Sequence, residues 1–390
     1  MKNYLFIVLI FFGASCIEPY DFEAIGTQEV LVVEATLTDQ GGENFVKLST
    51  SIGLTDSVQN PVRNATVWTE DNTGSTIYFN ESQPGLYEPD PLAAGVAGKS
   101  YILYITTSDG AQYKSNAEIL LPPTPIDSVY GEFKVFPSTE SGTTSRGVQF
   151  FLGASKNTST DASYYRYQIE QDYAIQVPYA SAYKWDENQL MYFARDTLIN
   201  VCYQHIPSTG ILITTTSGQT ENRVTELPLV LVEESDPYLL SKYSLITRQY
   251  TISPEAHQYY KTLKETNEAS GSFFDQQKGS PIGNMTSLKD SSKPVLGYFE
   301  VAGVATDTSI FSPSSWSQEG YNPERVFNEG CGYDNVADTV LLEDMLLGLV
   351  NMSYRNMYYI TTSGTSVVLV PKKCSDCRLY GTIKKPEFWD

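Results

Sequence analysis

Residues 30–121 alternate between apolar and polar side chains in short segments. Leu31, Val33, Ala35 and Leu37 share one face of the first segment, and Gly41-Gly42 mark a turn into a second over 44–51. A period of two is typical of a half-buried strand. Similar segments follow at 65–70, 75–79, 85–88, 101–107 and 111–118. Short strands at this spacing predict a β-sandwich domain of immunoglobulin or transthyretin type over residues 28–121.

The clearest boundary in the chain is Leu121-Pro122-Pro123-Thr124-Pro125. Consecutive prolines cannot join a sheet ladder and hold an extended, rod-like path. We therefore place a linker at 122–125. Strand-like segments at 126–136 and 147–154, separated by a loop over 137–146, open a second domain. We expect this larger, β-rich domain to span residues 126–390, so that the whole chain is mainly β.

One or two short helices are expected in the second domain. Residues 253–266 begin with Ser253 as a cap and Pro254 at the first helical position. Residues 338–351 have a similar apolar period, although Gly348 weakens this second helix. The last strands are predicted at 295–302 and 367–370.

The N-terminus predicts export and lipidation. Lys2 precedes an apolar run over 4–12, and the small residues Gly13-Ala14-Ser15 stand directly before Cys16. The run is far shorter than the roughly 20 residues of a membrane-spanning helix, so residues 1–15 are interpreted as a signal peptide. A thiol at this place is the acceptor for diacylglycerol, which predicts a lipid anchor on Cys16. The alternative is a secreted protein with a chance cysteine.

Residues 16–27 then form an acidic tether. Acyl chains on Cys16 would hold the protein on a membrane without a span, and no later segment offers 18 consecutive apolar residues. An acidic cluster after the lipidated cysteine resembles the signal that directs lipoproteins to the outer face of the outer membrane. We therefore expect a lipid-anchored outer-membrane protein on the cell-surface face.

The charge balance is strongly acidic. The chain has 26 Lys and Arg against 46 Asp and Glu, a formal net charge of −20. Nucleic acid and anionic lipid are therefore not expected as partners. The acidic residues are scattered and show no calcium-loop spacing, so solubility is the favoured reason for the charge.

Four cysteines besides Cys16 are the disulfide candidates: Cys202, Cys331, Cys374 and Cys377. An even number in an oxidising envelope predicts two disulfides that staple the C-terminal tail, with three pairings open. A zinc site would recruit His205 or His257. A redox site at Cys374 and Cys377 would need a thioredoxin-like context, which is missing. Two disulfides without metal are the preferred interpretation.

Aromatic residues are concentrated between 164 and 203. The segment 178–186 looks too irregular for a strand, and its Tyr179, Tyr183 and Trp185 are candidates for contact with a sugar, peptide or protein partner. Packing into the core is the competing interpretation, and the base rate for aromatic side chains favours it.

Catalytic motifs are scarce. His205 and His257 are the only histidines, and the sequence has no Gly-x-Ser-x-Gly elbow, phosphate loop or dinucleotide fingerprint. An envelope hydrolase with paired carboxylates stays open, because many acidic pairs exist. We expect a protein without cofactor that does not act as an enzyme.

A family resemblance is carried by the C-terminal Cys374-Ser375-Asp376-Cys377-Arg378 and by the segments 16–19, 31–38, 271–275, 296–299 and 385–389. Together they resemble a lipoprotein family of Bacteroidota, the domain-of-unknown-function family DUF4249. The resemblance covers nearly the whole mature chain, and its most specific part is the C-terminal Cys374-Ser375-Asp376-Cys377-Arg378. It implies an outer-membrane lipoprotein that helps a TonB-dependent receptor barrel, and it implies no catalytic residues.

Two functional hypotheses follow. The first is an accessory binding subunit of an outer-membrane β-barrel, based on the anchor, the tether and the family resemblance. The second is a free-standing surface lipoprotein that binds a glycan or peptide or acts as an adhesin, based on the aromatic residues of 164–203.

Overall fold

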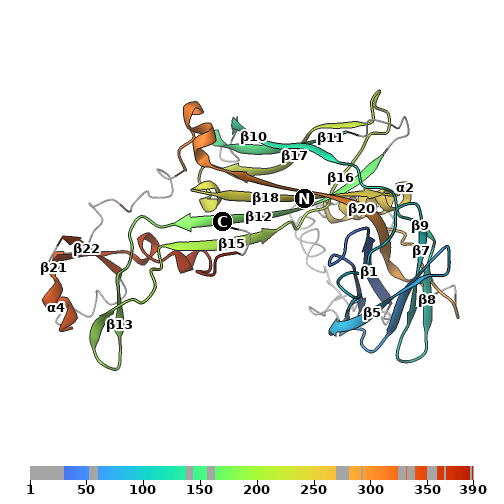
Figure 1. The fold of residues 1–390 in the computed structure, drawn as a ribbon, viewed down its shortest axis with the longest axis horizontal. Coiled ribbons are helices and arrows are strands. Elements are labelled where there is room, and N and C mark those ends of the chain that lie inside the picture. Colours follow the sequence, from blue (N-terminus) through green and yellow to red (C-terminus); the bar gives the residue numbers. More distant parts are fainter. Residues whose placement is uncertain are drawn as a thin grey trace, which may run out of the picture.

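The computed structural model describes residues 30–51, 60–137, 144–155, 163–268, 281–290, 293–323, 331, 339–348, 358–363, 366–386 and 389. The predicted signal peptide, Cys16, the acidic tether and the segment 271–275 lie outside these residues. The described part is mainly β, as predicted, and consists of one large mixed sheet with three smaller sheets (Figure 1). Among these residues, no helix has the length and apolar character needed to cross a membrane.

The N-terminal lobe contains the predicted short strands. Their alternating residues, including Val33, Leu37, Val46 and Leu103, are buried in one common core. The segment predicted at 111–118 is divided between two strands. The lobe comprises β1 (Leu31–Thr38), β2 (Phe45–Thr50), β3 (Asn60–Pro61), β4 (Thr66–Asp71), β5 (Thr76–Gln83), β6 (Leu86–Glu88), β7 (Ser100–Thr106), β8 (Gln112–Ser115) and β9 (Glu118–Ile119).

The central part of the molecule has two layers of strands. Phe150 and Val232 of the three-stranded sheet pack on Ile169, Tyr243 and Leu245 of the large sheet. The three-stranded sheet contains β10 (Ile126–Pro137), β11 (Thr144–Ser155) and β17 (Arg223–Glu233). The facing part of the large sheet contains β12 (Tyr164–Gln176), β15 (Val201–Pro207), β16 (Leu212–Thr215), β18 (Tyr243–Ile252) and β20 (Leu296–Phe311).

Strand β20 belongs to both parts of the molecule. Its first half pairs in parallel with β1, from Val32 opposite Leu296 to Thr38 opposite Ala302. The second half pairs antiparallel with β18, up to Tyr243 opposite Phe311. The predicted strand at 295–302 is therefore half of a longer one, and this strand joins the N-terminal lobe to the central sheet.

The proline segment lies against the central sheet. Thr124 is buried, and its backbone N–H donates to Thr251 Oγ1 at 3.2 Å while its carbonyl accepts from Gln249 Nε2 at 2.8 Å. Tyr165 also donates to Thr124 Oγ1. These bonds hold the segment that was expected to be a rod-like linker firmly on β12 and β18.

Helix α2 (Pro254–Glu268) confirms the predicted helix. Ser253 Oγ accepts from the Ala256 N–H at 3.1 Å and donates to Glu118 Oε2 at 2.9 Å. The cap thus ties the start of the helix to β9 of the N-terminal lobe. Tyr259 and Tyr260 pack on a core formed by β18 and β20.

Replacing Ser253 with alanine is expected to lower the free energy of unfolding by about 1–2 kcal/mol, because the helix loses its cap and Glu118 loses a donor. Urea denaturation followed by circular dichroism measures this change. Thr262→Ala on the same helix is the control, and it should be neutral or stabilising because alanine has the higher helix propensity. Equal effects of both variants would contradict the capping role.

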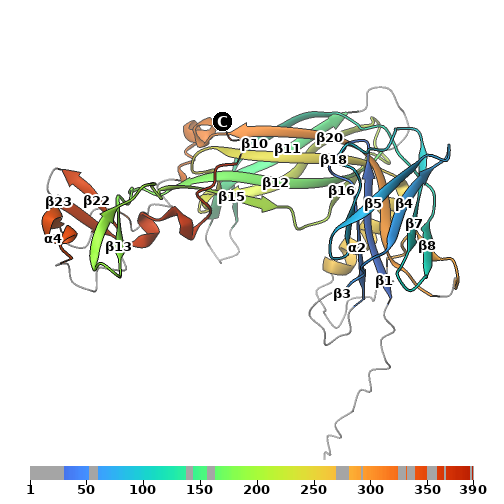
Figure 2. The same ribbon diagram turned by 60° about the horizontal axis from the view of Figure 1, so that its bottom comes forward.

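An arm extends from the far end of the central sheet (Figure 1, Figure 2). Its small core contains Tyr192, Met345, Val367 and Leu369. Two predictions fail here. Residues 183–186, expected to be irregular, form a strand, and the helix predicted at 338–351 is only five residues long. The arm comprises β13 (Tyr183–Asp186), β14 (Met191–Ala194), β21 (Thr339–Leu341), α4 (Leu342–Leu346), β22 (Tyr358–Ser363) and β23 (Ser366–Val370).

The short helix has a local cause. Gly348 takes a left-handed conformation with φ 71°, and it ends α4 because such a residue closes a helix. Residues 339–341 pair instead with β23. The remaining elements are β19 (Met285–Ser287) and the 3₁₀ helices η1 (Pro237–Leu239), η2 (Pro313–Glu319), η5 (Lys372–Cys374) and η6 (Cys377–Leu379).

Candidate functional site

The candidate site is a cleft of about 680 Å³ between the N-terminal lobe and the central sheet. Its size suits a small ligand, since such sites measure roughly 300–1,000 Å³. Strands β1, β12 and β18, helix α2 and the loop at 208–211 contribute its walls. Its charged, amide and aromatic lining residues are Glu34, Glu43, Phe45, Arg166, Tyr167, Gln168, Glu170, Arg248, Tyr250, Tyr259, Tyr260 and Tyr298.

An ion pair lies at the base of the cleft. Arg166 on β12 donates from Nε to Glu300 Oε2 at 2.8 Å and from Nη2 to Glu300 Oε1 at 2.5 Å. The Glu300 side chain is fully buried, and the Arg166 side chain is 16% exposed. Burial alone lowers the pKa of the Arg166 guanidinium, but the adjacent Glu300 carboxylate outweighs it and raises the pKa above its ordinary value. The Arg166 guanidinium therefore stays charged.

Aromatic rings enclose this arginine. The Arg166 guanidinium lies 4.0 Å from the ring centre of Tyr250 and 5.4 Å from that of Tyr260. Burial raises the pKa of Tyr250 to about 12. Burial and the nearby Glu300 raise the pKa of Tyr260 well above its ordinary value. The phenols are thus neutral hydrogen-bonding groups in the cleft.

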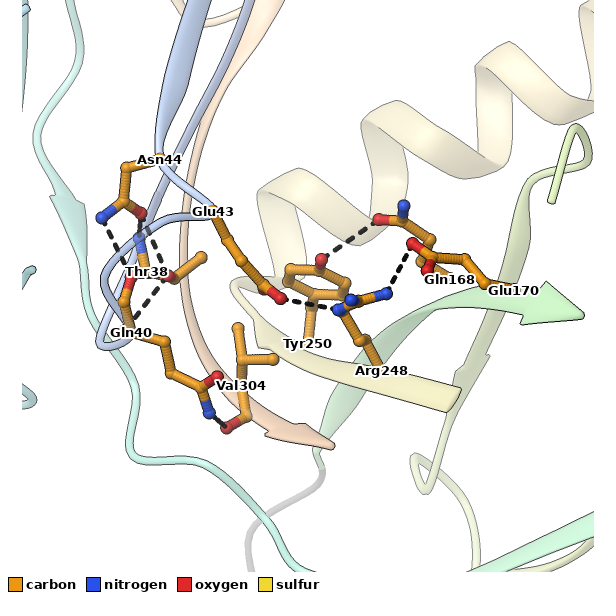
Figure 3. A network of polar contacts seen from close by, with 9 residues as sticks. All are labelled: Thr38, Gln40, Glu43, Asn44, Gln168, Glu170, Arg248, Tyr250 and Val304. Carbon is orange, nitrogen blue, oxygen red and sulfur yellow. Dashed lines mark hydrogen bonds and ion pairs between the residues drawn. The ribbon is translucent and has the colours of Figure 1, made fainter. Parts of the chain in front are cut away.

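Arg248 bridges the two parts of the molecule (Figure 3). From β18, its Nε donates to Glu43 Oε1 in the β1–β2 turn at 2.6 Å, and its Nη1 donates to Glu170 Oε1 on β12 at 2.6 Å. Tyr250 beside it donates to Gln168 Oε1 at 3.1 Å. Glu43 Oε2 is shielded from solvent and has no hydrogen-bond partner among the described residues. The Tyr167 hydroxyl, on another wall of the cleft, is likewise buried without a partner among the described residues.

The β1–β2 turn is fixed where the β1–β20 pairing ends. Asn44 Oδ1 accepts from the Thr38 N–H at 2.6 Å and from the Thr38 hydroxyl at 3.0 Å. Gln40 Nε2 donates to the Val304 carbonyl at 2.8 Å (Figure 3), and Asp39 Oδ1 accepts from the Val304 N–H. These contacts place Glu43 within reach of Arg248. The wall of the cleft is therefore also the joint between the N-terminal lobe and the central sheet, and hydrogen bonds hold it in place.

The charge of the cleft is negative. Arg166 is neutralised by Glu300, while Arg248 faces both Glu43 and Glu170. Neutral or cationic ligands therefore fit this lining better than anionic ones. The two histidines do not line the cleft: His205 bonds Asp172 at 2.9 Å, and His257 lies on α2 beside Tyr164. Over the described ranges no group of three His, Cys, Asp or Glu is arranged to hold a metal.

The aromatic residues predicted as partner contacts lie elsewhere. Tyr179 binds the disulfide region, since its hydroxyl donates to the Cys331 carbonyl at 2.7 Å and its N–H donates to the Cys374 carbonyl at 3.1 Å. Tyr183 and Trp185 are half-buried against the core of the arm. The structure does not bring them to the cleft, and their role as partner contacts stays a prediction.

The four cysteines form two disulfides, as predicted. Cys202 of β15 pairs with Cys377, and Cys331 pairs with Cys374. The two cysteines of the Cys374–Cys377 motif thus bind different partners. Tyr203 and Thr382 exchange two backbone hydrogen bonds beside the first disulfide. The C-terminal tail is therefore fastened to the edge of the central sheet.

The alternation of residue types along β12 indicated the polar lining of the cleft, and the interpretation of the sequence missed it. Arg166, Gln168 and Glu170 alternate with Tyr165, Tyr167 and Ile169 along β12. The aromatic members of this alternation attracted attention as core or contact residues. The polar members line the cleft instead.

A protein-family model matches most of this chain. No curated protein matches this sequence. The family model described as "Domain of unknown function (DUF4249)" matches residues 17–308, which include both parts of the molecule that enclose the cleft. Because the match covers most of the chain, this protein belongs to the DUF4249 family.

Proposed function

We propose that this protein is a lipid-anchored lipoprotein on the outer face of the outer membrane, where it serves as a non-catalytic binding subunit of an outer-membrane β-barrel such as a TonB-dependent receptor. The observation that carries the binding role is the cleft, in which both arginines are engaged by carboxylates. Arg166 is held by Glu300, and Arg248 by Glu43 and Glu170.

This pairing favours binding over catalysis. A general acid or base needs a titratable group near the operating pH that can reach a substrate. In the cleft the phenols have raised pKa values and the arginines are held charged by carboxylates. What the lining offers is preorganised hydrogen-bonding groups on a rigid joint, which suits recognition.

The membrane location rests on the N-terminal sequence. Gly13-Ala14-Ser15 before Cys16, and the acids that follow, support lipidation and surface exposure. The association of DUF4249-like lipoproteins with TonB-dependent receptors supports the choice of a barrel as partner.

Affinity purification of the lipidated protein from detergent-solubilised outer membranes is expected to recover a barrel in stoichiometric amount, identified by mass spectrometry. Protease shaving of whole cells should remove the protein from the surface. Cys16→Ser is the matched control, and it should move the protein from the membrane to the soluble fraction and abolish the capture. Recovery of the lipidated protein alone would contradict the barrel hypothesis.

The second candidate is a free-standing binder of a glycan or peptide. It is favoured by the combination of Tyr259, Tyr260 and Tyr298 with planar polar groups in the cleft, because aromatic faces and amide, guanidinium or carboxylate groups bind sugars and peptides. Surface shaving without a co-purified barrel would favour this candidate.

As part of this proposal, the strands of the N-terminal lobe form an immunoglobulin- or transthyretin-like sandwich that serves as the platform for the cleft. This is supported by the common core of the lobe, to which Val33 of β1 and Leu103 and Ile105 of β7 all contribute.

A further inference from the structure

The end of the arm exposes three leucines. Leu190 is 58% exposed, Leu341 is 56% exposed and Leu347 is 61% exposed. Leu190 lies in the turn between β13 and β14, and the other two lie at the two ends of α4. The arm carries this leucine tip (Leu190, Leu341 and Leu347) away from the N-terminal lobe (Figure 2). Clustered exposed apolar side chains mark interaction sites in soluble proteins.

Leu190 has an unfavourable backbone conformation for a leucine. Its φ is 52°, in the left-handed region, at the last position of a four-residue hairpin turn where glycine is favoured. The side chain extends into solvent, so it does not compensate by packing in the core. Left-handed backbone at a leucine that is 58% exposed is not offset by core packing, which points to a role in contact with another molecule.

Leu190 and Leu347 belong to one surface. A Cβ atom placed on Gly348 would lie 2.2 Å from the Leu190 carbonyl oxygen, so the end of α4 is pressed against the hairpin turn. Leu347 directly precedes Gly348. Beneath them, Trp185, Tyr192 and Met345 form the core of the arm. The leucines are therefore displayed on a packed support, as binding hot spots are.

The surroundings of the leucine tip are acidic. Asp186 and Glu187 stand on the hairpin, and Glu343 and Asp344 stand on α4. Lys184, on the same hairpin, lies 3.9 Å from Asp196. Such a rim is repelled by an anionic lipid surface, and it is repelled by a second copy of a chain with net charge −20. Its complement is an apolar pocket bordered by lysine and arginine.

We infer that the leucine tip is a docking surface for a partner protein that presents an apolar pocket with a basic rim. Leu190 and Leu347 insert into the pocket, and the acids around them face its basic residues. The inference deepens the proposed function, since it rests on the existence of the barrel partner and assigns the surface that this partner contacts.

The test uses the lipidated full-length protein and solubilised outer membranes as the probe. Leu190→Gly and Leu347→Ser are expected to reduce the recovered barrel at least tenfold relative to wild type. Leu92→Ser is the control, because Leu92 is 90% exposed in the N-terminal lobe, and it should leave recovery unchanged. Raising the salt to 0.5 M should weaken capture by the wild type, because the contact has a charged rim.

Leu190→Gly also separates docking from a structural role. It removes the side chain and relieves the left-handed leucine, so the variant should unfold at the same or higher urea concentration than the wild type. A loss of stability would overturn the inference. So would equal recovery of the barrel by all variants, which would leave the proposed function standing. Wild-type capture of no barrel would overturn both.

Two further outcomes also count against the docking surface. Leucine-dependent binding to vesicles of phosphatidylcholine and phosphatidylglycerol would assign the tip to the membrane. Leucine-dependent dimers in analytical ultracentrifugation would assign it to a second copy of this chain.

Discussion

Replacing Glu300 with alanine is expected to lower the free energy of unfolding by about 3–5 kcal/mol. The variant leaves the Arg166 guanidinium at the base of the cleft without its carboxylate. Because only 16% of that side chain is exposed, water cannot replace the lost partner well. An uncompensated charge in such a place costs more than the pair contributed. Urea denaturation followed by tryptophan fluorescence measures the change.

An exposed ion pair supplies the control. Glu34 and Lys47 lie 3.9 Å apart with side chains 66% and 53% exposed, so Glu34→Ala should cost no more than about 1 kcal/mol. The double variant Arg166→Met with Glu300→Leu should recover most of the lost stability, because it removes both charges and keeps apolar volume. Similar losses in Glu300→Ala and Glu34→Ala would show that the buried pair is not an important constraint.

The Arg166–Glu300 pair also shows what the sequence could predict of the site. Arg166 belongs to a clear alternation of polar and apolar residues on β12, so the sequence could have predicted a polar face on that strand. Its partner is 134 residues away in the chain. Which of the 46 acidic residues faces a given arginine depends on strand order, and spacing along the chain carries no information about it.

Strand β20 shows that pairing between distant parts of the chain is equally hard to predict for the fold. The apolar character of Leu296 to Ala302 predicted a strand, because the local period is visible in any window. Its neighbour β1 lies more than 250 residues earlier, and parallel pairing across such a distance has no local signal. The helix prediction in the arm was wrong for the opposite reason. The apolar period over 338–351 predicted a long helix, but the left-handed Gly348 ends it after five residues.

Removing the Cys202–Cys377 disulfide with two serines is the second change expected to have a large effect. The bond closes a loop with a sequence separation of 175 residues, for which chain entropy predicts a loss of about 5 kcal/mol. The Cys331–Cys374 bond spans 43 residues, and the same relation gives about 4 kcal/mol. The two double-serine variants should therefore rank in this order in urea denaturation under non-reducing conditions.

The position of the bonds gives a second, local expectation. Without the Cys202–Cys377 bond to β15, the two hydrogen bonds between Tyr203 and Thr382 lose their covalent support, so the tail should exchange its amide hydrogens faster. Loss of Cys331–Cys374 should instead affect Tyr179, which bonds the carbonyls of both cysteines. Hydrogen exchange read by mass spectrometry distinguishes the two regions. Unchanged stability and unchanged exchange in both double-serine variants would contradict this expectation. They would mean that packing and hydrogen bonds hold the tail in place without the disulfides.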